Sequence, residues 1–131
     1  MNYDFSQLND KEFEMLTADL LAELFKKRIE RFKPGRDGGV DGRFYSNMND
    51  EVILQCKHYS KTGYRGLINK LKQEERQKVK KLDPNRYIFV TSLPLSPDNK
   101  KEIRKIFSPY IQRDDDVFAK EDLNDLLSKH S

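Results

Sequence analysis

The stretch Gly35-Arg-Asp-Gly-Gly-Val-Asp41-Gly is followed, after nine further residues, by Val52-Ile-Leu-Gln55-Cys-Lys57-His-Tyr. The segments 40–46 and 51–58 have the short, β-rich pattern of strands, and the loop Asn47-Met48-Asn49-Asp50 between them predicts a hairpin. The glycine-rich segment before the first strand is a turn by composition. These residues therefore predict two antiparallel strands that carry polar side chains at the start of one and near the end of the other.

Gln55 and Lys57 share one face of the second predicted strand, because successive side chains of a strand point to opposite faces. Cys56, on the other face, is predicted to be a small core residue. The antiparallel partner strand begins at Asp41, which can lie across from Gln55 and Lys57. A carboxylate, an amide oxygen and waters suit Mg²⁺, and a lysine beside them can stabilise negative charge on a phosphate or help to deprotonate a water.

The rest of the chain alternates between helical and strand patterns, without repeats or low-complexity tracts. Asn9 or Asp10 can cap the first helix, and Glu12 completes a capping box if Asn9 is the cap. Helices are predicted at about 10–25, 65–81, 98–107 and 121–128, and further strands at about 28–33, 86–92 and 116–119. This order predicts one α/β domain over residues 1–131, with a mixed central sheet flanked by helices: helix, three strands, helix, strand, then a C-terminal helix, strand and helix.

The composition bounds the function classes. The chain has 25 Lys and Arg against 22 Asp and Glu, so it is mildly basic with a net charge of +3. Basic clusters at 26–28, 78–81 and 100–101 can form a phosphate-binding face, although solvated helix surfaces are the simpler interpretation of each cluster alone. No apolar stretch is long enough to span a bilayer, no secretory signal is present and the single cysteine cannot form an internal disulfide, so we expect a cytoplasmic location and no membrane partner.

Asp41 followed by Gln55-x-Lys57 resembles the PD-(D/E)xK nuclease motif in its Asp…Gln-x-Lys form, and the wording Gly-Val-Asp…Gln-Cys-Lys is similar to Mrr-like restriction endonuclease domains. The resemblance implies a restriction-endonuclease-like core and metal-dependent hydrolysis of DNA, expected to be double-stranded, with Mg²⁺ as cofactor and Mn²⁺ as a substitute. It implies catalytic roles for Asp41, Gln55, Lys57 and Glu14, and metal binding by Asp41, Gln55 and Glu14. Glu14 matches the glutamate that the first helix contributes in this family. Gln55 replaces the more common Asp or Glu, which predicts weaker metal binding.

The segment from Arg86 to Pro97 also resembles the Mrr-like nuclease domains at the N-termini of antiviral STAND NTPases. That resemblance implies an effector domain at the N-terminus of a longer antiphage defence protein, with NTPase and sensor domains in the same chain. Cleavage of both DNA strands would require two copies, so we expect a homo-oligomer. The chain has no P-loop of its own.

Two other functions stay open at this point. One is a catalytically silent nucleic-acid-binding module on the same fold, in which Lys61, Arg65 and the polar helix hold the DNA backbone. The other is an interaction domain that assembles larger complexes. His58 is a further candidate for contact with a DNA phosphate. For the nuclease, Lys57→Ala is predicted to abolish cleavage while leaving the stability of the fold unchanged or raised.

Overall fold

A computed structural model of the chain describes residues 3–32, 41–58 and 63–129. Within these ranges the centre of the molecule is a five-stranded sheet in the order β1-β2-β3-β4-β5. The first three strands pair antiparallel, and β4 and β5 are added in parallel, so the sheet is mixed. The strands are β1 (Glu30–Arg31), β2 (Gly42–Tyr45), β3 (Glu51–Lys57), β4 (Arg86–Thr91) and β5 (Val117–Phe118). The predicted α/β class and the mixed sheet are confirmed.

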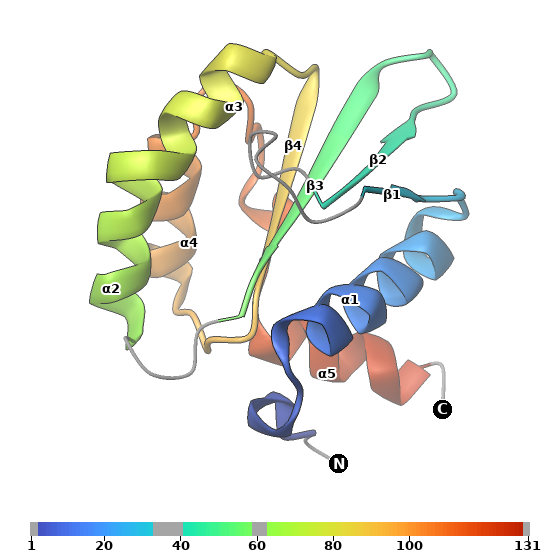
Figure 1. Cartoon of the computed structure of the whole chain (residues 1–131), viewed down its shortest axis with the longest axis vertical. Helices are drawn as coiled ribbons and strands as arrows, with labels where there is room; N and C mark the ends of the chain where they lie inside the picture. The colour runs from blue at the N-terminus through green and yellow to red at the C-terminus, as the bar shows by residue number, and fades with distance from the viewer. Residues whose placement is uncertain (1–2, 33–40, 59–62, 130–131) are drawn as a thin grey trace.

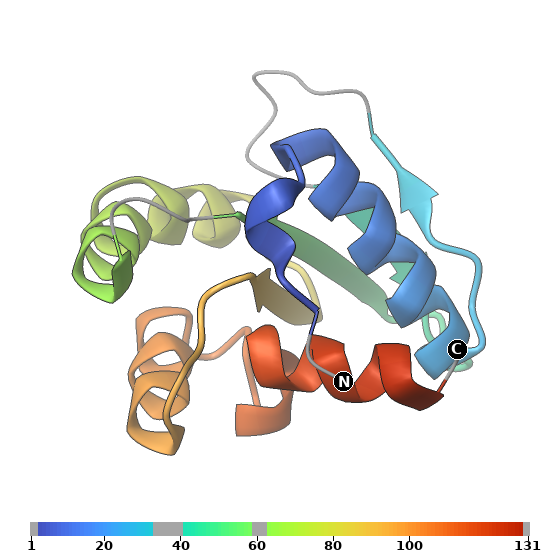
Figure 2. The same cartoon turned by 90° about the horizontal axis from the view of Figure 1, so that it is seen from below.

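Helices cover both faces of the sheet and give three layers (Figures 1 and 2). On one face lie α1 (Asp10–Phe25) and α5 (Lys120–Lys129), the first and the last α-helix of the described chain. On the other face lie α2 (Gly63–Lys70), α3 (Arg76–Leu82) and α4 (Pro97–Ile106). Single turns of 3-10 helix lie at Phe5–Gln7 and Asp114–Asp116. The C-terminal order of helix, strand and helix is therefore also confirmed.

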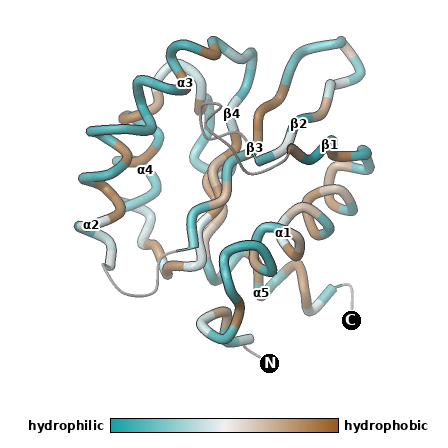
Figure 3. The backbone as a smooth tube through the Cα atoms, in the orientation of Figure 1, coloured by the Kyte–Doolittle hydropathy of each residue, from teal (hydrophilic) through white to brown (hydrophobic). Residues whose placement is uncertain are grey.

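The two central strands are buried on both faces, and their alternation divides the core into two clusters. Alternate residues of β3 and β4 face α1 and α5 and form one cluster. The residues between them face α2, α3 and α4 and form the second cluster. The first cluster contains Val52, Leu54, Ile88 and Val90, and the second contains Ile53, Tyr87 and Phe89. Figure 3 shows this hydrophobic stretch along the middle of the sheet, with hydrophilic residues on the outer helices.

Helix α1 begins as its sequence predicts. The Asn9 side chain accepts a hydrogen bond from the Glu12 N–H at 2.8 Å, and the Glu12 carboxylate accepts one from the Asn9 N–H at 2.9 Å. This capping box satisfies two backbone donors that have no partner within the helix. With the helix start fixed, Phe13 is fully buried and Glu14 follows it at the edge of the buried face.

The polar helix predicted at about 65–81 is continuous from Gly63 to Leu82, but it contains a π-helical turn, Leu71–Glu75, between α2 and α3. A π turn holds more residues than the 3.6 of an α-helical turn, so it rotates the following residues around the axis. The side chains that face the sheet recur every four residues: Leu67, Leu71, Glu75 and Val79. In an unbroken α-helix this spacing would drift away from the sheet. The π turn thus keeps Glu75 inside, which the sequence did not predict.

Some predictions fall outside the described residues. These are the glycine-rich turn at 34–39, the first residue of the strand predicted at 40–46, and Lys61. Among the residues that are described, no helix has the length and apolar character needed to cross a membrane.

Candidate active site

The four residues singled out by the sequence come from three elements. Glu14 lies in α1, Asp41 directly precedes β2, and Gln55 and Lys57 lie near the end of β3. The Asp41 N–H donates to the Leu54 carbonyl at 3.0 Å, so the start of the β2 segment is bound beside the end of β3, as the predicted hairpin requires. The order of the elements therefore brings α1, β2 and β3 together at one end of the sheet.

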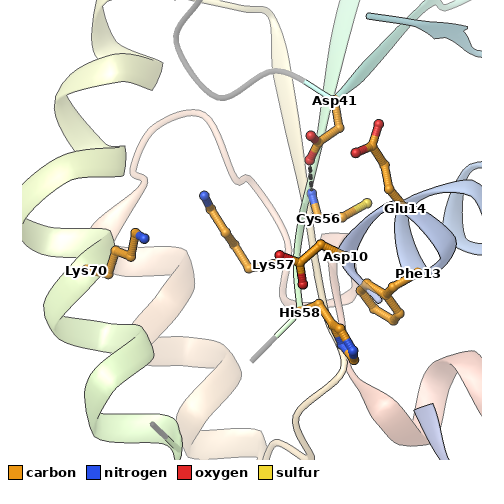
Figure 4. Close-up of a pocket in the computed structure, with 8 residues that line it drawn as sticks. All are labelled: Asp10, Phe13, Glu14, Asp41, Cys56, Lys57, His58 and Lys70. Atoms are coloured by element: carbon orange, nitrogen blue, oxygen red, sulfur yellow. Dashed lines mark hydrogen bonds between the residues drawn. The ribbon is translucent and has the colours of Figure 1, made fainter. Parts of the chain in front are cut away.

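A polar cavity of about 320 Å³ opens at this end of the sheet, and three of the four predicted residues line it: Glu14, Asp41 and Lys57. Figure 4 shows the carboxylates of Glu14 and Asp41 close together on the α1 side, with Lys57 and Lys70 on the side of α2. The full lining is Asp10, Phe13, Glu14, Asp41, Cys56, Lys57, His58 and Lys70. The cavity therefore has an acidic wall and a basic wall.

Asp41 is held by the backbone of β3. One of its carboxylate oxygens accepts a hydrogen bond from the Cys56 N–H at 2.5 Å. Burial raises the pKa of Asp41 to about 6; the Cys56 hydrogen bond opposes this rise, and the nearby Glu14 carboxylate adds to it. The protein alone thus stabilises the charged form of Asp41 poorly. This is expected of a carboxylate whose negative charge is compensated by a bound cation.

Glu14 shows the same tendency. Burial raises the pKa of Glu14, and the positive charges of Arg31 and Lys11 only partly oppose the rise. Two neighbouring carboxylates that lack full compensation fit a divalent cation, which takes oxygen ligands. Among the described residues no group of three or more His, Cys, Asp or Glu side chains is placed to hold a metal, so a cation here would depend on these two carboxylates and on neutral oxygens.

Gln55 does not line the cavity. Its side chain is buried, donates from Nε2 to a Glu75 carboxylate oxygen at 2.6 Å, and accepts a hydrogen bond from the Tyr87 hydroxyl through Oε1. Because a carboxylate can only accept, the amide orientation is fixed. The structure brings Gln55 and Lys57 to one face of β3, as predicted, but it turns the Gln55 amide toward the helical layer. Metal binding by Gln55 stays a prediction.

Lys57 links the cavity to the same helical layer. Its ammonium lies 3.1 Å from Glu75 Oε1, while Glu75 itself is only 1% exposed. Burial acts to raise the pKa of Glu75, but the hydrogen bond from Gln55 and the charge of Lys57 outweigh it, so the pKa is lowered overall. Glu75 is the functional candidate that the sequence analysis missed.

His58 is bound on both sides of its ring. Nε2 lies 2.8 Å from the Leu8 carbonyl, which can only accept, so Nε2 carries a proton. Nδ1 lies 2.7 Å from the Ser92 hydroxyl, and the ring stacks on Phe13 with a centroid distance of 4.7 Å. These contacts join β3 to the segment before α1 and to the end of β4. The ring therefore forms part of the cavity floor, and both nitrogens that could contact a phosphate are already in use.

Cys56 faces away from Gln55 and packs against the core cluster of α1 and α5, as predicted, but it is only partly buried and also lines the cavity. Burial, together with the negative charges of Asp41 and Glu14, raises the pKa of the Cys56 thiol well above its ordinary value. The thiol is therefore kept neutral beside the carboxylates and is not a reactive nucleophile.

Comparison with known proteins agrees with this geometry. The family model Mrr_cat, described as a restriction endonuclease, matches residues 5–115, a range that contains every cavity residue. The chain is also 41% identical over 130 residues to the uncharacterized protein y4cD of Sinorhizobium fredii (strain NBRC 101917 / NGR234). That alignment covers 99% of this chain and 20% of the relative, so the chain spans about a fifth of the relative's length. The match over residues 5–115 shows that the chain belongs to the Mrr-type restriction endonuclease family.

Proposed function

We propose that this domain is a divalent-metal-dependent endonuclease that hydrolyses phosphodiester bonds of DNA. The single observation that supports this activity is the cavity that Asp41 and Glu14 line on the α1 side and Lys57 lines on the α2 side. The carboxylate oxygens can bind a metal ion, and the ammonium can stabilise negative charge on the phosphate ester.

Asp41 and Glu14 would hold the metal, with Gln55 contributing only if its amide oxygen leaves the Tyr87 hydroxyl and turns to the cavity. Mg²⁺ is the expected ion, with Mn²⁺ as a substitute, because the donors are hard oxygens. When bound, such an ion supplies Lewis-acid chemistry to a phosphate oxygen or to a water. Lys57, on the cavity wall, stabilises the negative charge that develops on the phosphate. Lys70, on the same side, contributes to holding the DNA backbone.

We further infer that the domain works as the effector of a larger defence protein. Two facts support this: the resemblance of the β4 region to nuclease domains of antiviral STAND NTPases, and a relative about five times as long as this chain. In that setting NTPase and sensor domains would control the nuclease in the cytoplasm. Each copy would supply this cavity for one strand, so cleavage of both strands of a duplex would use two copies.

The test is cleavage of supercoiled plasmid by the purified 131-residue chain, alone and fused to a dimerising coiled coil, with Mg²⁺, with Mn²⁺ and with excess EDTA. We expect nicked and linear products with either metal and none with EDTA, and no products from Asp41→Asn. Binding of DNA without cleavage in every metal and in both forms would instead support a catalytically silent nucleic-acid-binding module. Full activity in EDTA would remove the metal from the mechanism.

A further inference from the structure

We propose that Glu75 is a positioning residue of the nuclease, which holds the Lys57 ammonium and the Gln55 amide in place from the helical layer. The inference rests on the proposed function. Its basis is one buried carboxylate with two partners on the same strand: Oε1 lies 3.1 Å from Lys57 Nζ, and Oε2 accepts from Gln55 Nε2 at 2.6 Å. No motif in the sequence marks Glu75 for this role.

Lys57 needs such a partner because of its own chemistry. A lysine carries a compact charge on a flexible four-carbon stem, so its ammonium explores many positions unless a contact restricts it. The Lys57 side chain is 21% exposed and lines the cavity, whereas its partner carboxylate is almost fully enclosed. The enclosed carboxylate is therefore the fixed end of the pair, and it determines where the ammonium stands at the cavity wall.

Glu75 is itself well fixed. Its second oxygen is bound by Gln55, whose own oxygen accepts from the Tyr87 hydroxyl, and Lys78 approaches Oε1 at 3.7 Å. Gln55 and Tyr87 are both buried within the core and cannot easily move. This chain of contacts runs from β4 through β3 to the helix, so the position of Lys57 is determined by the sheet.

The backbone provides an independent observation. Glu75 ends the π-helical turn Leu71–Glu75, and this turn keeps it facing the sheet. π turns are rare within helices and occur frequently at functional sites. A buried ion pair adds little stability compared with apolar residues of similar volume, so folding alone does not require a glutamate at this position. A π turn that directs a carboxylate at Lys57 is explained if the position of the Lys57 ammonium matters for the reaction.

The experiment compares Glu75→Gln, which keeps size and polarity but removes the charge, with Glu74→Gln, the exposed neighbour. Glu75→Leu is the second variant. Because an apolar residue suits a buried position, this variant should fold even if Glu75→Gln does not. We expect both Glu75 variants to lower kcat about 10- to 100-fold, with KM for DNA and the Mg²⁺ concentration for half-maximal rate unchanged. Glu75→Asp, which keeps the charge with a shorter reach, should recover part of kcat, and Glu74→Gln should cut like the parent.

Three results would overturn the inference, and they can be told apart. If the parent cuts and a folded Glu75 variant cuts equally fast, Glu75 has no positioning role and the proposed function stands. If excess Mg²⁺ restores the rate of Glu75→Gln, Glu75 is a metal ligand instead. If the parent cuts no DNA under any of the conditions above, the proposed function fails and the inference fails with it.

Discussion

The ammonium of Lys57 lies 3.1 Å from the carboxylate of Glu75, a residue at the end of the π-helical turn that is almost fully enclosed by the core. Lys57 therefore has a structural partner as well as a place on the cavity wall. Lys78, at 3.7 Å, is the only other cation recorded at this carboxylate among the described residues. Removing Lys57 consequently has two separable effects, one on the reaction and one on the fold.

Lys57→Ala should abolish detectable cleavage, because a group that stabilises transition-state charge typically contributes about a hundredfold or more in rate. It should also lower the free energy of unfolding by roughly 1–3 kcal/mol, because the buried Glu75 carboxylate loses its closest cation. The loss of stability differs from the expectation drawn from the sequence, which predicted that Lys57→Ala would leave the stability of the fold unchanged or raised. Cleavage rate and urea unfolding of the same preparation measure both effects.

The control for this prediction is the double variant Lys57→Ala with Glu75→Gln. It removes the buried charge together with its partner, so it should regain most of the stability that Lys57→Ala loses while remaining inactive. A single Lys57→Ala variant that is as stable as the parent would show that Lys78 and Gln55 suffice for Glu75. A folded variant that cuts at the parent rate would remove Lys57 from the mechanism.

The fold was predictable from the sequence because its signals are local. The Asn9 and Glu12 side chains mark the start of α1 within four residues, and the alternating direction of side chains along a strand assigns Gln55 and Lys57 to one face. Asp41 was correctly placed beside the end of β3, since a short hairpin fixes the register of its two strands.

Glu75 could not be predicted in the same way. Helical spacing from Leu71 reaches both Glu74 and Glu75, and the surrounding residues are too polar to indicate which one faces inward. The choice depends on the π turn, and on the contact with Gln55, which lies 20 positions away in the chain and is itself bound by the Tyr87 hydroxyl. The same long-range contacts decide the orientation of the Gln55 amide, which the pattern of the strand leaves free.

Glu14→Gln tests the second carboxylate of the cavity. If Glu14 holds the metal, removing its charge should raise the Mg²⁺ concentration for half-maximal cleavage about tenfold to a hundredfold, which corresponds to the loss of one charge-assisted contact. The maximal rate in saturating Mg²⁺ should fall much less. Asp19→Asn is the matched control, because Asp19 is exposed on the same helix and does not line the cavity. An unchanged Mg²⁺ requirement in Glu14→Gln would exclude Glu14 from the metal site.

Lys70→Ala tests DNA binding apart from cleavage. Lys70 lines the cavity on the side of α2, where the DNA backbone would pass. In EDTA, a plot of the logarithm of the association constant for a duplex against the logarithm of the salt concentration should have a slope of about −0.9 for each phosphate contact. Losing one contact should therefore make this slope less steep by about one. Lys129→Ala, at the end of α5 and outside the cavity lining, should leave the slope unchanged. Equal slopes for both variants would place the DNA elsewhere.

Asp41→Asn gives a prediction in which activity and stability change in opposite directions. Burial raises the pKa of Asp41 from the ordinary 3.8 to about 6 in the folded protein. The folded state thus binds this proton more tightly than the unfolded state, so the charged carboxylate reduces stability above pH 6, and this cost disappears as the pH falls toward 4. The difference between the two pKa values corresponds to about 3 kcal/mol at most.

Asparagine keeps an oxygen that can accept the hydrogen bond from the Cys56 N–H, so the backbone contact survives while the charge is lost. In EDTA, Asp41→Asn should therefore unfold at higher urea concentration than the parent at pH 8, and by a much smaller margin at pH 4.5, while cutting no DNA with Mg²⁺ at either pH. Added Mg²⁺ should stabilise the parent and not the variant, because a ligand that binds only the folded state shifts unfolding by mass action. If Asp41→Asn is less stable than the parent at pH 8 in EDTA, the Asp41 charge stabilises the hairpin. The raised pKa of Asp41 would then not indicate a binding site for a cation.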